Sequence, residues 1–241
     1  MQKGIKFRIY PNREQKNFIH QTLGCCRLIY NRGLAMRKES YEEGKKIGYT
    51  QTSAMLTELK RQEEFAFLKA ADSIALQQSL RDLDRSFVNF FQKRASYPTF
   101  KSKHNRFQSY RTVNQKDNIR IVGRYIKLPK LGFVKIRQSM EVGKINHVTI
   151  EYTPAGKYFA VLNIDFEPEP RPNAGGTIGI DVGIKAFYSD SNGNTVSNPR
   201  YLERSMRKLI REQRRLSRKQ KDSHNRGKQR LRVARVHEKI A

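Results

Sequence analysis

The chain has 241 residues, of which 37% are hydrophobic and 29% charged, enough for a sizeable core and for two or three domains. Lys and Arg number 49 against 22 Asp and Glu, and the net charge of +27 favours nucleic acid over an anionic membrane as the partner. The sequence has no apolar run of about 18 residues, no signal peptide and no spaced cysteines, which excludes a membrane span, secretion and a disulfide framework and predicts a cytoplasmic protein.

The N-terminal residues 3–10 alternate apolar and basic side chains, a period-two pattern that predicts a half-buried strand. Lys6 and Arg8 then form a cationic outer face. Asn12 and Gln15 have the spacing of a capping box, in which each side chain accepts a hydrogen bond from the backbone N–H of the other residue. We therefore expect a helix to begin directly after the strand.

Residues 13–112 are predicted to form a helical domain. Gly44 is a candidate end for the first helix, and a second begins near Thr52. The third helix has the clearest pattern, because Asp72 or Ser73 can cap it and large apolar side chains follow at helical spacing. These apolar residues, which we assign to a helix-bundle core, are Leu76, Leu80, Leu83, Phe87 and Phe90 or Phe91.

Residues 96–112 interleave aromatic and basic side chains. Basic groups neutralise phosphates and aromatic faces stack on unpaired bases, so this aromatic–basic stretch indicates contact with nucleic acid. The alternative is a solvated loop whose aromatic side chains return to the core. The candidate nucleic-acid-binding residues here are Tyr97, Phe100, Lys101, Lys103, Asn105, Arg106, Tyr110 and Arg111.

Residues 113–168 change to a period of two. Short alternating runs punctuated by glycines predict closely spaced strands, which suggests a small antiparallel β-barrel. The segment 169–176 is rich in Pro and Gly and is predicted to be a linker and a domain boundary.

Asp181 is the single carboxylate of the apolar, glycine-flanked run 177–187, which reads as the first strand of a hairpin. Such a strand suits the opening of a ribonuclease-H-like sheet, in which several carboxylates hold two Mg²⁺ ions. An ordinary strand-end Asp is the alternative. Sugar kinases and chaperone ATPases open on a related strand, but here Ile184 and Lys185 stand where those proteins usually carry a phosphate-binding Thr or Ser.

Residues 200–241 read as one or two long helices, with 15 Lys and Arg against 4 Asp and Glu over 201–241. A helix this charged is not core. It is either a solvated face or a surface that follows phosphates, and the sign of the charge favours the second. The candidates for phosphate contact are Arg204, Arg207, Arg211, Arg214, Arg215 and Arg218.

Four stretches together resemble the TnpB (OrfB) proteins of bacterial insertion sequences, which are compact RNA-guided DNA endonucleases related to type V CRISPR effectors. The stretches are residues 8–37, 97–112, 126–137 and 179–193. In order, they look like the family's helical N-terminal segment, its aromatic–basic signature, its wedge barrel and the opening of its RuvC nuclease domain.

The resemblance implies an α+β fold. Strand 1–12 would join the wedge barrel 113–168, the helical recognition lobe 13–112 would be inserted between them, and 177–241 would begin a ribonuclease-H-like (RuvC) domain with inserted basic helices. The barrel and lobe would bind a transposon-end guide RNA and its heteroduplex with target double-stranded DNA. The protein would work in the bacterial cytoplasm, associated with the nucleoid, with neither a membrane nor a small-molecule substrate as partner.

By position, Asp181 matches the family's first catalytic carboxylate, which implies a Mg²⁺ ligand. None of the later acidic residues matches the family's second acid, a Glu on a later strand, or its third, an Asp near the C-terminus. Three functions stay open: a Mg²⁺-dependent nuclease, a nuclease-silent RNA-guided repressor or regulator, and a plain RNA-binding protein. We expect the 241-residue chain to bind structured RNA with steep salt dependence and not to cleave matched DNA.

Overall fold

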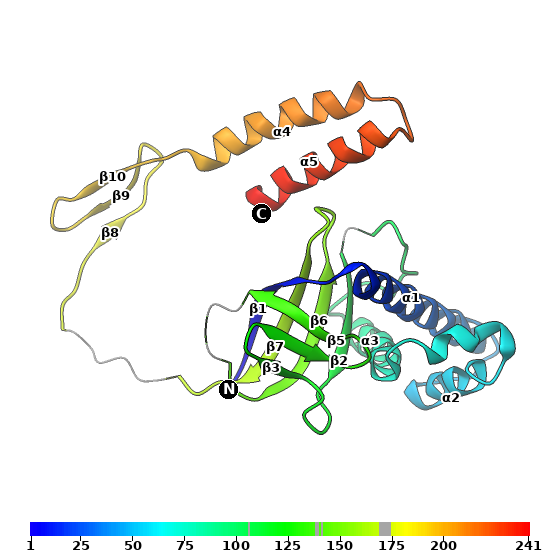
Figure 1. The fold of residues 1–241 in the computed structure, drawn as a ribbon. Helices are drawn as coiled ribbons and strands as arrows, with labels where there is room; N and C mark the ends of the chain where they lie inside the picture. Colours follow the sequence, from blue (N-terminus) through cyan, green and yellow to red (C-terminus); the bar gives the residue numbers. More distant parts are fainter. Residues whose placement is uncertain (106, 138–139, 141, 169–174) are drawn as a thin grey trace. The chain divides into compact units, whose positions relative to one another are not determined.

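The computed structural model describes residues 1–105, 107–137, 140, 142–168 and 175–241. It divides into two compact units, Met1–Glu167 (unit 1) and Pro168–Ala241 (unit 2). The division falls beside the predicted linker 169–176, most of which lies outside the described residues. Together the units contain both helices and antiparallel sheet, an α+β fold (Figure 1).

Unit 1 is built on one antiparallel sheet in the order β2-β6-β7-β1-β5-β4-β3. The first strand of the chain lies between β7 and β5, as the resemblance implies, so the N-terminus is part of the later sheet. Within the described residues β2 and β3 each pair on one side only, so the expected barrel is a curled half-barrel. The strands are β1 (Gln2–Tyr10), β2 (Gln108–Val113), β3 (Arg120–Val122), β4 (Tyr125–Leu128), β5 (Gly132–Arg137), β6 (Ile145–Tyr152) and β7 (Tyr158–Asp165).

The helices of unit 1 are α1 (Arg13–Glu42), α2 (Tyr49–Leu59), the 3₁₀ helix η1 (Glu63–Lys69) and α3 (Ser73–Phe91). The predicted capping box is confirmed: the Gln15 N–H donates to Asn12 Oδ1 at 2.8 Å, and the Asn12 N–H donates to Gln15 Oε1 at 3.0 Å. The Gln15 amide also donates to the Phe133 carbonyl at 2.9 Å, which ties the start of α1 to β5. Asp72 caps α3 as predicted, accepting from the Ile74 N–H at 2.9 Å.

The inner face of the sheet and α1–α3 share one apolar core. Ile9 and Leu162 from the sheet, Ile29 from α1 and Leu80 from α3 are each 0% exposed, and burying such a side chain contributes about 1.5–3 kcal/mol. Helices α1 and α3 lie against each other closely, because a Cβ placed on Gly33 would come within 2.9 Å of Leu80 Cδ2. The core therefore holds the helices rigidly against the sheet.

The predicted helical domain 13–112 ends early. Helix α3 stops at Phe91, and Lys93, two residues later, adopts a left-handed φ of 58°. Residues 108–112 belong to strand β2, in which Tyr110 and Thr112 alternate into the core. The last residues of the aromatic–basic stretch therefore alternate between core and surface because they form a strand.

Unit 2 contains a small antiparallel sheet in the order β10-β9-β8, followed by a hairpin of two helices. Only Ile180–Asp181 of the predicted first strand pairs, and its apolar neighbours are exposed, Val182 by 72%. A short three-stranded sheet has too little surface to bury such side chains by itself. The elements are β8 (Ile180–Asp181), β9 (Ala186–Asp190), β10 (Thr195–Ser197), α4 (Tyr201–Ser217) and α5 (His224–Ile240).

Candidate nucleic-acid interface

The aromatic–basic stretch is anchored to α1 through Lys101. Its backbone N–H donates to Asn31 Oδ1 at 2.8 Å, and the Asn31 amide donates to the Lys101 carbonyl at 3.0 Å. The Lys101 ammonium lies 4.0 Å from the centre of the Tyr30 ring. Burial lowers the pKa of Lys101, and the carboxylate of Asp82 partly offsets that effect. Lys101 therefore fixes the path of the stretch in addition to carrying charge.

The first residues of the stretch present rings and cations at the surface. Tyr97 packs edge-on against Phe87 and Phe90, with ring centres 5.6 and 5.2 Å apart, and stays 45% exposed. Arg106 lies outside the described residues. The remaining candidates of this part are exposed, a position that suits contact with a nucleic acid: Phe100, Lys103 and Asn105.

Tyr110 and Arg111 occupy structural positions instead. Tyr110 is only 6% exposed, and burial raises the pKa of its hydroxyl. Arg111 forms an ion pair with Asp82 of α3 and is 19% exposed. A buried ring offers no face to a base, and a paired guanidinium must lose its partner before it can meet a phosphate. Both side chains therefore pack within unit 1, and their role in binding nucleic acid stays a prediction.

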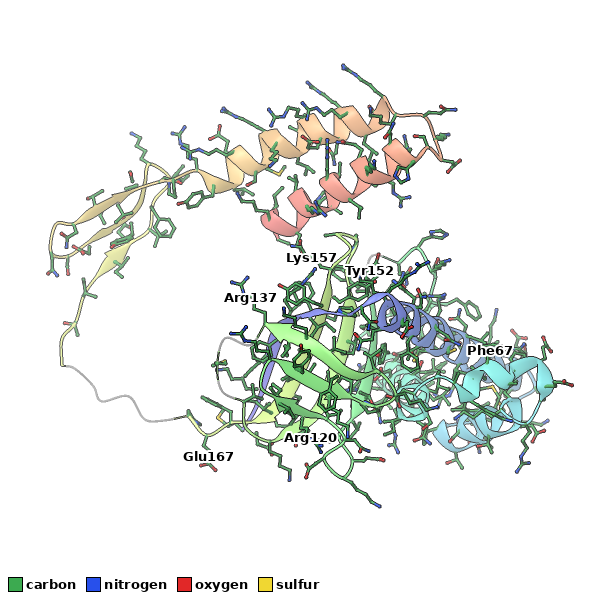
Figure 2. The ribbon with its side chains drawn as sticks, in the orientation of Figure 1. Phe67, Arg120, Arg137, Tyr152, Lys157 and Glu167 are labelled. Carbon is green, nitrogen blue, oxygen red and sulfur yellow. The ribbon has the colours of Figure 1, made fainter. Side chains whose placement is uncertain are left out.

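A second cationic surface, which the candidate residues above do not include, covers the outer face of the sheet. Its residues alternate with core residues and meet across strands: Arg8 lies opposite Arg137, and Lys135 lies opposite both Tyr10 and Tyr125. We call these five residues the outer sheet face. Tyr10 and Tyr125 are each 48% exposed, and Arg137 is exposed as well (Figure 2). The alternation of core and outward-facing residues over 133–137 is the sequence pattern from which this surface could have been predicted.

The outer sheet face combines charge with aromatic rings. The Arg8 guanidinium lies 5.1 Å from the centre of the Phe159 ring, and the Lys6 ammonium lies 4.6 Å from the same ring. A shallow hollow of about 760 Å³ lies beside Tyr10 and Arg137, with Arg124 on its wall. Cations for phosphates and rings for bases are the two groups that unpaired nucleic acid requires.

Helix α4 and its C-cap residue Arg218 carry the predicted arginines on their surface. All six are exposed, and five of them line a groove of about 340 Å³ around Ile210. The opposite side of the helix packs on α5, where Glu212 is buried and accepts a hydrogen bond of 2.7 Å from Gln229 Nε2. This packing leaves the arginine row outward, with Arg207 paired to Glu203 and Arg215 paired to Glu212. The row consists of Arg204, Arg207, Arg211, Arg214, Arg215 and Arg218.

Asp181 is an exposed residue of β8 and pairs with Ser189 of β9. The neighbouring Asp190 is engaged in the turn, where it accepts hydrogen bonds of 2.9 Å from the backbone N–H groups of Asn192 and Asn194. The side-chain hydrogen bond from Asn194 is the main reason why the pKa of Asp190 is lowered.

Mg²⁺ takes oxygen ligands in octahedral geometry, and a two-ion site needs several carboxylates. Within the described residues no three His, Cys, Asp or Glu side chains gather closely enough to hold a metal ion. Asp181 alone does not supply the ligand set for a pair of Mg²⁺ ions. Separately, no described helix has the length and apolar character needed to cross a membrane.

Two parts of the chain match known families. Residues 1–46 match a family described as a helix-turn-helix domain, and residues 147–241 match one described as a probable transposase, both of the OrfB IS605 type. In the structure, the first match covers strand β1 and the single long helix α1.

Three curated proteins are similar to this chain. A Streptomyces pristinaespiralis protein named as an RNA-guided DNA endonuclease is 37% identical over 244 residues, which cover 100% of this chain and 60% of that protein. Escherichia coli K12 InsQ, with the same functional name, is 34% identical over 245 residues, 99% of this chain and 60% of that protein. The Salmonella dublin virulence protein VsdF is 32% identical over 114 residues, 43% of this chain and 96% of that protein. The chain spans 60% of the length of the first two relatives.

Proposed function

Because this chain belongs to the TnpB (OrfB) family of insertion-sequence proteins, we propose that it binds a guide RNA and target double-stranded DNA as part of an RNA-guided DNA endonuclease. The observation that carries the proposal is the outer sheet face, where arginine, lysine and tyrosine side chains alternate on neighbouring strands. The arginine row of α4 supports it with a second cationic surface.

The chemistry of these surfaces suggests which part of the nucleic acid each of them would bind. In guided systems base pairing reads the sequence, while the protein holds the backbone and reads a short adjacent DNA motif. Lys135 and Arg137 would neutralise RNA phosphates, and Tyr10 would offer its exposed ring to an unpaired base. The arginine row would follow a second stretch of backbone. None of these contacts selects a sequence, which suits a protein whose guide does so.

We also propose Asp181 as a Mg²⁺ ligand of the complete nuclease site. This rests on its position in the family's pattern, since its exposed carboxylate on β8 has no partner ligands among the described residues. The 241-residue polypeptide should therefore bind RNA and matched DNA without cutting the DNA when Mg²⁺ is added. The alternative is a nuclease-silent RNA-guided binding module, which would use the same nucleic-acid-binding surfaces.

The test is purification of the 241-residue chain from its host with any bound RNA, which is then sequenced and titrated back at several salt concentrations. We expect enrichment of RNA from the transposon end and an affinity that falls linearly on a log–log plot against salt. A salt-independent affinity would contradict a phosphate-binding role. Mg²⁺-dependent cutting of matched DNA that disappears in Asp181→Asn would contradict the expected lack of cleavage.

Substitutions on the outer sheet face show whether this surface carries the binding. The double variant Lys135→Gln/Arg137→Gln should weaken RNA binding by roughly tenfold or more at physiological salt, because two phosphates are no longer neutralised. Lys116→Gln, which removes one exposed charge from the loop after β2, is the control and should bind like the parent. Equal affinities for the double variant and the control would remove the outer sheet face from the proposal.

A further inference from the structure

A hollow of about 650 Å³ lies where the C-terminal ends of α1 and α3 meet the start of the aromatic–basic stretch. Its volume falls within the range of about 300–1,000 Å³ that is typical of ligand pockets. Neither the outer sheet face nor the arginine row includes any of its residues. The residues that matter for its chemistry are Tyr41, Lys45, Lys46, Phe90, Phe91 and Tyr97.

One wall of this hollow is a cluster of packed aromatic rings. The Tyr97 ring meets Phe87 and Phe90 at 89° and 86°, and the Phe91 ring stacks on Phe87 with a centre-to-centre distance of 6.3 Å. Phe91 nevertheless stays 73% exposed, and so does Tyr41 on α1. Exposed rings gathered in one hollow mark an interaction site more often than rings scattered singly.

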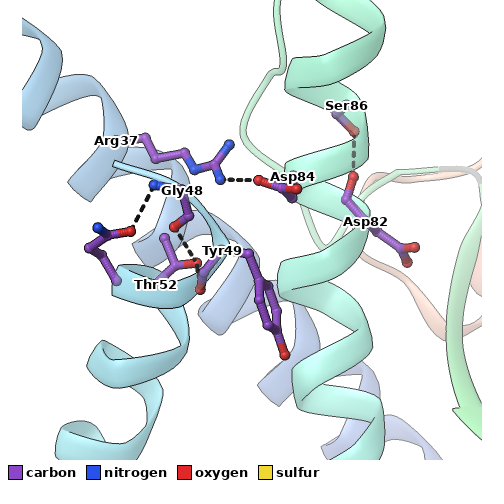
Figure 3. A network of polar contacts seen from close by, with 8 residues as sticks. Arg37, Gly48, Tyr49, Thr52, Asp82, Asp84 and Ser86 are labelled. Carbon is purple, nitrogen blue, oxygen red and sulfur yellow. Dashed lines mark hydrogen bonds and ion pairs between the residues drawn. The ribbon is translucent and has the colours of Figure 1, made fainter. Parts of the chain in front are cut away.

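The base of the wall is held by Arg37 of α1. It is 8% exposed and pairs with Asp84 of α3 (Figure 3). Its guanidinium lies 4.7 Å from the centre of the Phe87 ring. Its Nε atom is buried and has no hydrogen-bond partner among the described residues. Arg37 thus links the two helices that carry Tyr41 and Phe91 at the base of the hollow.

The charge of the hollow is positive. Lys45 and Lys46 line it together with Arg37, and no carboxylate belongs to its described lining. Lys45 reaches Glu43 at 3.0 Å, but both side chains are more than half exposed, and such surface pairs add little to stability. The two lysines are therefore available to an anionic ligand at little cost.

We propose that this hollow holds an unpaired nucleotide, whose base stacks on Tyr41 or Phe91 and whose flanking phosphates meet Lys45 and Lys46. The proposal rests on the nucleic-acid binding proposed above and adds a specific site to it. Exposed π faces beside cations match a nucleotide, since every base has a face for stacking and every linkage a negative charge. A guide RNA and a displaced DNA strand both supply such a nucleotide.

The experiment uses the complete 241-residue chain and short single-stranded oligonucleotides of one sequence, as RNA and as DNA, each with a central 2-aminopurine. Stacking on a ring quenches 2-aminopurine fluorescence, while anisotropy of an end label reports binding anywhere on the chain. The variant is Tyr41→Leu/Phe91→Leu, which keeps apolar side chains in the hollow but removes both π faces. The matched control is Phe67→Leu, which removes a 44% exposed ring from η1.

We expect the parent and Phe67→Leu to quench the probe, and the double leucine variant to lose the quenching and about fivefold or more in affinity. Lys45→Gln/Lys46→Gln should weaken binding and retain the quenching at saturation. Quenching of RNA alone assigns the site to the guide, and quenching of DNA alone assigns it to a displaced strand.

Two outcomes would overturn the proposal in distinguishable ways. If the oligonucleotides bind but the leucine variant quenches like the parent, the nucleotide site is wrong while the proposed function stands; a partner that tolerates leucine, such as an apolar peptide, would then fit the hollow better. If neither the oligonucleotides nor transposon-end RNA bind the parent at all, the proposed function itself fails. Because Tyr41 and Phe91 are mostly exposed, the thermal unfolding of the leucine variant should match that of the parent.

Discussion

Tyr110 and Arg111 are neighbours on β2. Their surroundings allow a role in packing to be tested separately from a role in binding RNA. Tyr110→Ala removes a core ring and should lower the free energy of unfolding by about 3–5 kcal/mol. Tyr110→Phe keeps the ring packing and loses only the hydroxyl, so it should cost about 1.5 kcal/mol at most. Urea unfolding measures both changes. The RNA affinity of Tyr110→Phe should equal that of the parent, because the ring lies inside the core.

Tyr125 provides the matched control for this prediction, since it is a tyrosine of the same sheet that is 48% exposed on the outer sheet face. Tyr125→Ala should change the free energy of unfolding by about 0.5 kcal/mol or less and should weaken RNA binding. If Tyr110→Phe folds normally but binds RNA poorly, the Tyr110 hydroxyl contacts the RNA and its assignment to the core alone is wrong.

A local sequence pattern does not determine which residues of a stretch are buried and which are exposed. The aromatic–basic stretch predicts rings and cations but cannot separate Tyr97 from Tyr110. That separation depends on long-range pairing, because Tyr110 lies opposite Ile150 of β6, far along the sequence. Arg111 likewise meets Asp82 of α3 only after the sheet and helix have come together. Pairings of this kind carry no signal within a short sequence window.

At the scale of elements, the sequence predicted a helix or strand correctly where the residues that determine it lie within that element. The capping box at Asn12 and the cap at Asp72 were predictable, since both act within three residues. The strands of the sheet were predictable from their alternation. The half-barrel was not, because closure depends on whether the edge strands β2 and β3 meet. The exposure of β8 shows a related limit: an apolar sequence leads to burial only where a second layer covers it.

The arginine row of α4 permits a quantitative prediction at this scale. Arg211→Gln/Arg214→Gln/Arg218→Gln removes three cations from the groove without changing helix propensity much. The slope of log affinity against log salt should become shallower by about 0.7–0.9 for each phosphate that is no longer neutralised. Filter binding of RNA–DNA heteroduplex at several salt concentrations measures it.

The control for the arginine row is Arg230→Gln, which removes an exposed arginine from α5 of the same unit. It should lower the affinity slightly and change the slope by less than the amount expected for a single phosphate. If the triple variant and this control have equal slopes, the arginines of α4 are a solvated face and contribute only to solubility.

For the whole of unit 1, two histidines predict sensitivity to mild acid. His147 of β6 is partly buried; burial and then the positive charges of Arg111 and Arg85 lower its pKa, which Asp82 offsets in part. The pKa of His20 is lowered by burial and by Lys103, and its Nε2 shares a hydrogen bond of 2.8 Å with Tyr158. Both folded-state pKa values therefore lie below the ordinary value of 6.5.

The sign of the effect follows from proton uptake. At pH values between the folded-state pKa of each histidine and its ordinary pKa, the unfolded chain binds more protons than the folded one. The free energy of unfolding therefore falls as the pH decreases through 6.5. Urea midpoints of unit 1, followed at pH 7.5 and 5.5, should drop for the parent and drop less for His147→Gln. His224→Gln, an exposed substitution in unit 2, should leave the drop unchanged. An equal drop in parent and His147→Gln would mean that His147 accepts a proton in the folded sheet as readily as in the unfolded chain.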